Sequence, residues 1–394
     1  MPLSSLRPEA LNAPSSGIVE VFDYGRHRAG LIPLWVGEGD LPTPSFISEA
    51  ATRSLAAGET FYTYQSGLPD LRQAIADYIN RHYGTAYGMD RFHVTIGGMH
   101  ALQMAMRMVA GAGDEVLIPT PAWPNFYGAS VVSGARPVDV PMSLIPRGND
   151  HIWALDFDRM KAAVTAQTKA IIINSPANPT GWTATRAELQ QVLDLARQKG
   201  LWIIADEIYG RFVYDGSDRA PSFHDIMDDK DQIMFVQTLS KNWAMTGWRI
   251  GWLECPSWMG ETVENLVQYS SSGVAAFMQR AAIAALEQGE PFVSHQLQRA
   301  RTGREIVMRG LRQLEQVHFG AVDGAFYLFF RVDGITDTRQ LALDLVDSAN
   351  VGLAPGTAFG TGAQDYMRMC FARKAEDLEE ATQRIVKALR SLGS

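Results

Sequence analysis

The chain has 394 residues and a formal net charge of −8, which is long enough for one large domain and a smaller one. Its Lys and Arg residues are scattered, so wide contact with nucleic-acid phosphates is not expected. Two cysteines without metal or redox spacing, no charged and apolar leader, and no run near the roughly 18 apolar residues of a membrane span lead us to expect a cytoplasmic protein without a membrane segment.

Helical patterns alternate with short apolar runs through the middle of the chain. Pro69 opens a helical pattern with apolar residues at 71, 75 and 79, and Thr185 with Glu188 matches a capping box at the start of another helix. Runs rich in branched residues predict strands at 94–96, 115–118, 170–173, 201–205, 233–236 and 249–253. This alternation predicts an α/β fold with a mostly parallel sheet.

The pattern changes beyond about residue 274. Amphipathic stretches lead to strand candidates at 325–332 and 366–372, and a last helix carries apolar residues at 378, 381, 385 and 389. We therefore expect a small α+β domain at 291–394, joined by an N-terminal segment at 1–45, beside a large domain at 46–290.

The segment TLSKNWAMTGWRIGW at 238–252 combines hydroxyl groups, a lysine and an arginine. A desolvated lysine at a strand end supplies the free amine that forms an imine with an aldehyde, which is the chemistry we assign to Lys241. Thr238, Ser240 and Arg249 are then placed to bind a phosphate dianion. Taken alone, the motif also fits an ordinary surface lysine.

Two further strand ends carry polar side chains. Asp206 follows the apolar run LWIIA, where a buried carboxylate keeps a pyridine nitrogen protonated, although the same residue fits an ordinary helix N-cap. Asn178 lies in the loop after IIIN, where its amide can donate to a phenolate oxygen, although turn chemistry also explains this loop.

Three other segments offer contacts for an aromatic, anionic ligand. Gly98 stands between a strand and a helix, where free backbone N–H groups bind phosphate. Trp123 lies in a strand-end loop and either stacks on an aromatic ring or belongs to the core. Arg368, among apolar neighbours, needs an anion, which is either a substrate carboxylate or an internal ion-pair partner.

Together these segments resemble the class I/II aminotransferases of the fold type I pyridoxal-phosphate enzymes, in order from about residue 30 to 375. The matching motifs are GEGD at 37–40, YTYQSGLPDLR at 62–72, the glycine-led loop, the aromatic residue, NPTG at 178–181, DEIY at 206–209, Ser240 with Lys241, Arg249 and a C-terminal arginine. The resemblance implies a large domain with a mostly parallel, seven-stranded-type sheet and a smaller α+β domain.

The resemblance also implies the cofactor, pyridoxal 5'-phosphate, as a Schiff base on Lys241, which then shuttles a proton in an aminotransferase working by ping-pong half-reactions. Asp206 would pair with the pyridine nitrogen, Asn178 and Tyr209 with the ring oxygen, and Trp123 would stack on the ring. The phosphate would be held by Thr238, Ser240, Arg249 and the backbone around Gly98, Met99 and His100. Met99 and His100 depart from the small residues of many relatives, so only backbone contacts are inferred there.

Substrate and partner follow from the same resemblance. Arg368 would bind the α-carboxylate of an amino acid or 2-oxo acid, with Gly37, Trp123 and Asn178 beside the substrate. Tyr62 matches the tyrosine that completes the neighbouring subunit's site, so a homodimer is expected. Candidates for the side-chain pocket include 16–18, and we expect a broad or neutral-to-aromatic preference.

Three alternatives remain open at this point. The same cofactor supports a β-lyase acting on carbon–sulfur bonds, of which the stretch LWVGEGD at 34–40 is reminiscent. A regulator that uses this fold as a sensor would need an added DNA-binding domain. A Ser-Lys hydrolase at Ser240 and Lys241 would leave Asp206 and Arg249 unexplained. The sequence contains no nucleotide-binding or H-x-x-x-H pattern, so no metal is implied.

Overall fold

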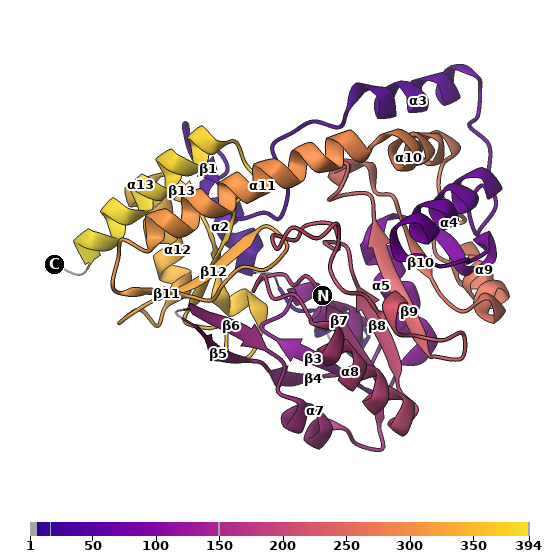
Figure 1. Cartoon of the computed structure of the whole chain (residues 1–394), viewed down its shortest axis with the longest axis horizontal. Coiled ribbons are helices and arrows are strands. Elements are labelled where there is room, and N and C mark those ends of the chain that lie inside the picture. The colour runs from indigo at the N-terminus through magenta and orange to yellow at the C-terminus, as the bar shows by residue number, and fades with distance from the viewer. Residues whose placement is uncertain (1–5, 16, 149, 393–394) are drawn as a thin grey trace.

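The computed structural model describes residues 6–15, 17–148 and 150–392. Its large sheet has seven strands in the order β2-β10-β9-β8-β7-β3-β4 (Figure 1). These strands are β2 (Phe92–Thr95), β3 (Glu115–Thr120), β4 (Arg136–Pro141), β7 (Thr168–Asn174), β8 (Trp202–Asp206), β9 (Ile233–Thr238) and β10 (Gly251–Glu254). The strand β10 runs antiparallel to both of its neighbours, β2 and β9, and all other neighbouring pairs are parallel. The predicted α/β class with a mostly parallel sheet is confirmed.

Helices cover both faces of this sheet because alternate side chains of its strands point in opposite directions. Ile171 and Ile203 pack in one core cluster with α8 (Arg186–Lys199). Ile172 and Ile204, the next residues along the same strands, pack with α5 (Gly97–Val109) in another. The predicted capping box starts α8, since the Thr185 side chain accepts from the Glu188 N–H and Glu188 accepts in return.

The strand predictions miss one member of the sheet and misplace some ends. The strand β4 was not predicted, because Pro137 and Pro141 interrupt its apolar pattern; it pairs only with β3 and so tolerates proline as an edge strand. The strand expected at 249–253 begins at Gly251, because Arg249 has a left-handed backbone with φ of 52°.

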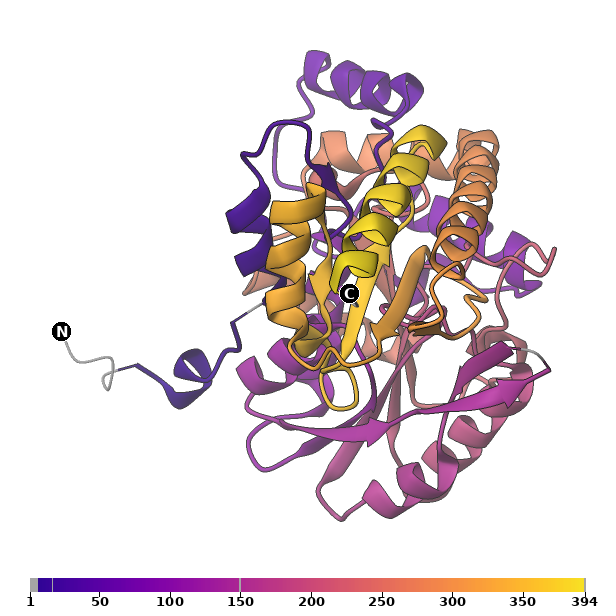
Figure 2. The ribbon, with the colours of Figure 1, turned by 90° about the vertical axis from the view of Figure 1, so that its left-hand side faces the viewer.

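A second, antiparallel sheet lies beside the first in Figures 1 and 2. Its order is β11-β12-β15-β14, formed by β11 (Val317–Phe319), β12 (Tyr327–Val332), β15 (Tyr366–Cys370) and β14 (Ala354–Pro355). The helices α11 (Glu290–Leu311), α12 (Thr338–Ala349) and α13 (Ala375–Leu392) share its apolar core. The N-terminal β1 (Ile32–Pro33) pairs with β13 (Val351–Gly352), so distant segments meet here. The domain limits at 45 and 290 stay a prediction.

The remaining elements complete the outer layers. They are α1 (Pro8–Leu11), α2 (Gly17–Gly25), α3 (Ser45–Ala56), α4 (Pro69–Tyr83), α6 (Pro124–Val132), α7 (Phe157–Ala163), α9 (Gly260–Gln268), α10 (Ala276–Gln288), the hairpin β5 (Ser143–Arg147) and β6 (Asp150–Ala154), and the 3-10 turns η2 (Met89–Arg91), η3 (Phe223–Asp225), η4 (Thr246–Trp248), η5 (Ser257–Met259) and η6 (Gly356–Phe359). Within the described ranges, no helix is long and apolar enough to cross a membrane.

Trp35 packs the N-terminal segment against β13 through close contact with a glycine. Its side chain is buried, and a Cβ atom on Gly352 would lie 1.9 Å from Cε3 of its ring. We therefore predict that Gly352→Ala destabilises the protein by about 1–3 kcal/mol through overpacking, measured as a lower thermal midpoint.

Gly128→Ala is the matched control for this substitution. Gly128 lies within α6, and a Cβ atom there would have no neighbour within 4 Å. Alanine in a helix interior is favoured over glycine by roughly 0.5–1 kcal/mol, so the midpoint should stay or rise. Equal midpoints for the two variants would contradict the packing argument.

Candidate active site

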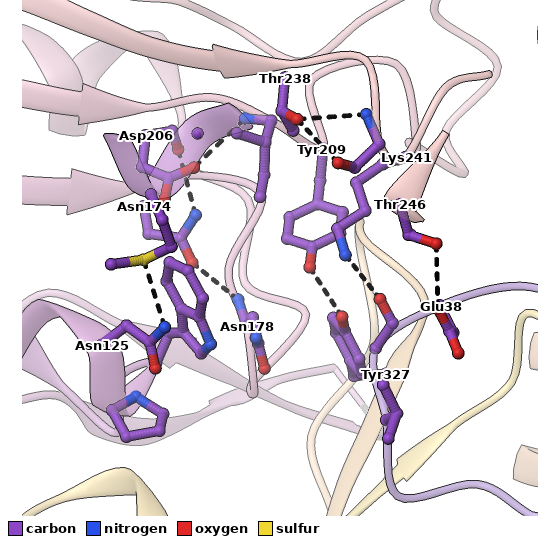
Figure 3. A pocket seen from close by; sticks show the side chains of 18 of the residues that line it. Glu38, Asn125, Asn174, Asn178, Asp206, Tyr209, Thr238, Lys241, Thr246 and Tyr327 are labelled. Atoms are coloured by element: carbon purple, nitrogen blue, oxygen red, sulfur yellow. Dashed lines mark hydrogen bonds between the residues drawn. The ribbon is translucent and has the colours of Figure 1, made fainter. Parts of the chain in front are cut away.

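A cavity of about 400 Å³ opens at the carboxyl ends of the large sheet's strands (Figure 3). Parallel strands bring their carboxyl ends to one edge of a sheet, which is why residues far apart in sequence meet there. The predicted residues that line the cavity are Gly37, Gly98, Met99, Trp123, Asn178, Asp206, Tyr209, Thr238, Ser240, Lys241, Arg249 and Arg368. Twelve of the predicted site residues are therefore brought together.

Lys241 lies in the cavity with its amine held by the N-terminal segment. Its Nζ donates to the Gly37 carbonyl oxygen at 2.6 Å and lies 5.9 Å from the centre of the Tyr209 ring. Burial disfavours the ammonium cation and lowers the pKa of Lys241 to about 8. Near neutral pH the free amine is therefore far more abundant for Lys241 than for an ordinary lysine.

Asp206 is the buried carboxylate of the cavity and ends β8. Its Oδ1 accepts from the backbone N–H of Ile208 at 3.3 Å, and Asn174 donates to the Asp206 carbonyl oxygen at 3.1 Å. Burial raises the pKa of Asp206 to about 7. The contacts of Asp206 within the protein compensate little of its negative charge. A cationic or N–H partner in the cavity would therefore stabilise the charged carboxylate strongly.

Thr238, Ser240 and Arg249 form a polar group at one end of the cavity. Thr238 donates to the Ser240 hydroxyl at 2.9 Å, and Arg249 Nη1 donates to the Thr246 carbonyl oxygen at 2.5 Å. Gly97 permits this group: its φ is +71°, and a Cβ atom there would lie 2.6 Å from Arg249 Nη2. The guanidinium and the hydroxyls are donors suited to a phosphate.

The start of α5 faces the same end of the cavity. The first backbone N–H groups of a helix have no partner within the helix, and Gly98 and Met99 line the cavity there. The His100 side chain turns away, because its Nδ1 accepts from the Ile96 N–H and its Nε2 lies 3.0 Å from the Ser270 hydroxyl. These contacts hold the His100 side chain, so a ligand contact through the backbone of His100 stays a prediction.

Arg368 reaches the cavity from β15 of the small sheet. Its Nη1 donates to the Asn178 side-chain oxygen at 2.9 Å, and its Nη2 donates to the Trp35 carbonyl oxygen. No carboxylate of the described chain pairs with it, and its buried Nε has no hydrogen-bond partner. The internal ion pair considered from the sequence is therefore absent from the described residues, and the cation can bind an anion.

Sequence reasoning missed several residues of the cavity. Asn174 faces Asp206 across the β7–β8 pairing and holds the backbone of Asn178 at 2.8 Å, so its place at the end of the run IIIN was a usable signal. Tyr327 offered no signal, since it lies in an apolar strand of the small sheet. The other missed lining residues are Val19, Val36, Glu38, Pro124, Asn125, Ile208, Val236 and Thr246.

Tyr62 and Ser16 were also predicted as residues of a binding site. Tyr62 is 95% exposed and does not line the cavity of its own chain. Ser16, a candidate for the side-chain pocket, lies outside the described residues, whereas Ile18 of α2 lines the cavity. No group of three or more His, Cys, Asp or Glu side chains is arranged for a metal ion in the part of the chain that the structure describes.

Known proteins match this chain along nearly its whole length. The family described as Aminotransferase class I and II matches residues 30–385. The chain is 34% identical over 380 residues to the aspartate aminotransferase of Pyrococcus abyssi, covering 95% of this chain and 96% of that protein. It is 32% identical over 379 residues to aromatic-amino-acid aminotransferase 2 of Thermococcus litoralis, covering 95% and 96%.

A solved structure agrees with these sequence matches. The aspartate aminotransferase of Thermotoga maritima superposes on this chain with a TM-score of 0.90 at 30% identity. The superposition covers 99% of this chain and 100% of that one. The resemblance inferred from the motifs is confirmed, and so is the expected fold.

The lowered pKa of Lys241 gives a direct test. The test uses protein freed of small molecules and trace amounts of an amine-specific reagent. We predict that labelling of Lys241 rises with pH and has its midpoint near pH 8, because the free amine forms above that pH. Peptide mass spectrometry measures the label, and the exposed Lys199 reports that the reagent stays active across the pH range. A midpoint above pH 10 would contradict the burial argument.

Proposed function

Because this chain belongs to the class I and II aminotransferase family, we propose that it moves the amino group of a neutral or aromatic L-amino acid to a 2-oxo acid, with pyridoxal 5'-phosphate carried on Lys241. Enzymes of this family use that cofactor. The observation that carries the proposal is one cavity holding both a buried amine of lowered pKa and a buried carboxylate of raised pKa.

The donors of the cavity fit the two polar ends of the cofactor. The cradle left by Gly97, with Arg249, Thr238, Ser240 and the start of α5, suits the phosphate. At the other end, Asp206 lacks a partner for its charge and suits a protonated ring nitrogen. We assign phosphate binding and ring binding to these groups.

When bound, pyridoxal 5'-phosphate supplies an aldehyde carbon that takes up the amino group and a ring that accepts the electrons released at the substrate's Cα. Asp206 would hold the proton on the ring nitrogen, which would make the ring a better electron acceptor. Tyr209 and Asn178, which line the cavity, would donate to the ring oxygen, and Trp123 would cover one face of the ring. These contacts are the roles that we propose for the four side chains.

Lys241 is proposed as both the attachment point and the base. Its free amine would take up the proton released at the substrate's Cα and would give it up again within the cavity to complete the transfer. The lowered pKa suits this task, because an amine that is half protonated near pH 8 can accept and release a proton. The Gly37 carbonyl that accepts from its Nζ fixes the side chain toward the cavity.

Arg368 is proposed to bind the α-carboxylate of the substrate. Asn178 and the Trp35 carbonyl hold its two terminal nitrogens, and the charge has no carboxylate partner among the described residues. A bound carboxylate satisfies this buried cation and fixes the direction of the substrate's Cα–H bond toward Lys241.

The lining of the cavity supports a neutral or aromatic side chain. Ile18 and Val19 of α2 and Val36 of the N-terminal segment contribute apolar surface. The cations among the described lining residues are Lys241, Arg249 and Arg368, each of which already has a proposed role. The described lining residues therefore offer no further cation for a second carboxylate, although several relatives are named for aspartate.

We also propose a cytoplasmic homodimer. Phe61, Tyr62, Tyr64 and Tyr269 form an aromatic patch and are 85%, 95%, 64% and 89% exposed. Their segments adjoin, because Gln65 donates to Gln268 at 2.6 Å. A large exposed apolar patch favours association with a second copy, in which Tyr62 would complete the neighbouring site. The buried free thiols of Cys255 and Cys370 fit a reducing compartment.

The function is tested with purified enzyme, pyridoxal 5'-phosphate, 2-oxoglutarate as acceptor and a panel of amino acids. We expect amino-group transfer from neutral or aromatic donors, because the pocket is apolar, with each product measured by chromatography. A strong preference for aspartate would contradict the substrate assignment. Pyruvate and ammonia formed from a cysteine conjugate without a 2-oxo acid would instead indicate the carbon–sulfur lyase, which no comparison supports.

Lys241→Ala tests the attachment point in the same assay. We predict a loss of at least ~10³-fold in turnover, because both the attachment and the base are removed. After borohydride reduction, mass spectrometry should find the cofactor on the peptide containing Lys241 in the wild type and on no peptide in the variant. Covalent cofactor in Lys241→Ala would refute the assignment.

The dimer is tested by placing a charge in the aromatic patch. Phe61→Asp should shift the protein toward monomers in analytical ultracentrifugation, because a carboxylate would be buried in the interface. Trp258→Asp is the control: this residue is 71% exposed and lies in η5, at the other end of α9 from Tyr269. A wild-type monomer, or equal dissociation of both variants, would contradict the proposed interface.

A further inference from the structure

Two tyrosine hydroxyls meet inside the cavity. Tyr209 follows β8 of the large sheet, Tyr327 begins β12 of the small sheet, and their hydroxyl oxygens lie 2.7 Å apart (Figure 3). The residues are separated by 118 positions in the sequence. This hydrogen bond therefore connects the sheet that carries Asp206 with the sheet that carries Arg368.

The surroundings of Tyr327 leave its hydroxyl little freedom. The side chain is fully buried, its ring meets the Tyr209 ring edge-on at 87°, and the Arg368 guanidinium lies 4.7 Å from the ring centre. On the remaining side, a Cβ atom at Gly37 would lie 2.0 Å from the hydroxyl oxygen. Gly37 is required here because any side chain would displace the hydroxyl.

The direction of this hydrogen bond follows from proton counting. A tyrosine hydroxyl has one proton to donate. When Tyr209 donates its proton to the ring oxygen of the cofactor, as the proposed function requires, the bond between the two hydroxyls must use the proton of Tyr327. Burial raises the pKa of both hydroxyls, so both keep their protons at neutral pH.

We propose that Tyr327 is a positioning residue that donates to Tyr209 and so strengthens the hydrogen bond from Tyr209 to the cofactor's ring oxygen. This inference rests on the proposed function. Consecutive hydrogen bonds polarise one another, so a donor to Tyr209 makes Tyr209 a better donor. Tyr327 thereby links the position of the substrate-binding Arg368 to the ionisation of the bound cofactor.

The test uses holoenzyme and the visible absorbance of bound pyridoxal 5'-phosphate, which changes when the ring system loses a proton. Tyr209→Phe should raise the midpoint pH of this absorbance change, because the anionic ring oxygen of the cofactor loses the hydrogen bond from Tyr209. Tyr327→Phe keeps the ring beside Arg368 and should raise the midpoint by a smaller shift, on the order of 0.3 pH units. The double variant should equal Tyr209→Phe, since Tyr327 acts only through Tyr209.

Tyr214→Phe is the matched control. Its hydroxyl donates to the Ala325 carbonyl oxygen, and it is not among the residues that line the cavity. The Tyr214→Phe variant loses one partly buried hydrogen bond near β12, so its thermal midpoint should fall. Its absorbance midpoint should stay at the wild-type value. An equal absorbance shift in this variant would mean that Tyr327→Phe reports general loosening, which overturns the inference.

The remaining outcomes are also decisive. If Tyr209→Phe shifts the absorbance midpoint and Tyr327→Phe does not, the inference is wrong and the proposed function stands. If Tyr327→Phe causes the same shift with and without Tyr209, then Tyr327 does not act through Tyr209 and the inference is again wrong. If the wild type shows no cofactor band, the proposed function fails, and the inference fails with it.

Discussion

Removal of water from Lys241 and Asp206 is the constraint on which the rest of this site depends. An isolated charge in a protein interior is costly, so the lysine tends to lose its proton and the aspartate tends to keep one. Both shifts bring the groups into the range where protons move near neutral pH. A ligand with a cationic ring nitrogen offsets the cost of a buried negative charge on Asp206. Burial of this carboxylate therefore favours binding of such a ligand, and the ligand stabilises the charged carboxylate.

The cavity is built between two sheets, and glycine makes their close approach possible. Gly97 leaves room for the Arg249 guanidinium, and Gly37 leaves room for the Tyr327 hydroxyl. Gly37 also accepts the hydrogen bond from Lys241 through its carbonyl oxygen. The N-terminal segment therefore takes part in the chemistry of the site through its backbone, while β1 ties that segment to β13 of the C-terminal part.

The polar contacts across the cavity form two groups of hydrogen bonds. Arg368 binds Asn178, Asn174 binds the backbone of Asn178 and of Asp206, and Tyr327 binds Tyr209. Each contact joins residues from different strands or loops, so the two groups are complete only when both sheets are in place. Preorganised donors of this kind cost little reorganisation during the reaction, which suits them to orient a substrate and hold a ring.

Much of the site could be predicted because its residues stand next to readable features. Asp206 directly follows an apolar strand, and Lys241 follows two hydroxyl residues at a strand end, so the sequence indicates their place in a parallel sheet. Tyr327 could not be predicted as a site residue, because its neighbours in β12 are apolar and its role depends on a residue 118 positions away. The edge strand β4 was missed because its prolines break the pattern by which buried strands are recognised.

The sequence by itself therefore determined the α/β alternation, the family and the chemical groups of the cavity, since these depend on local patterns and on residue type. Only the tertiary structure decided the pKa of Lys241, the partners of Arg368 and the bond between Tyr209 and Tyr327. Burial and distance between remote residues arise from packing. A one-residue change in the register of β12 or β15 would turn Tyr327 or Arg368 to the opposite face of the small sheet.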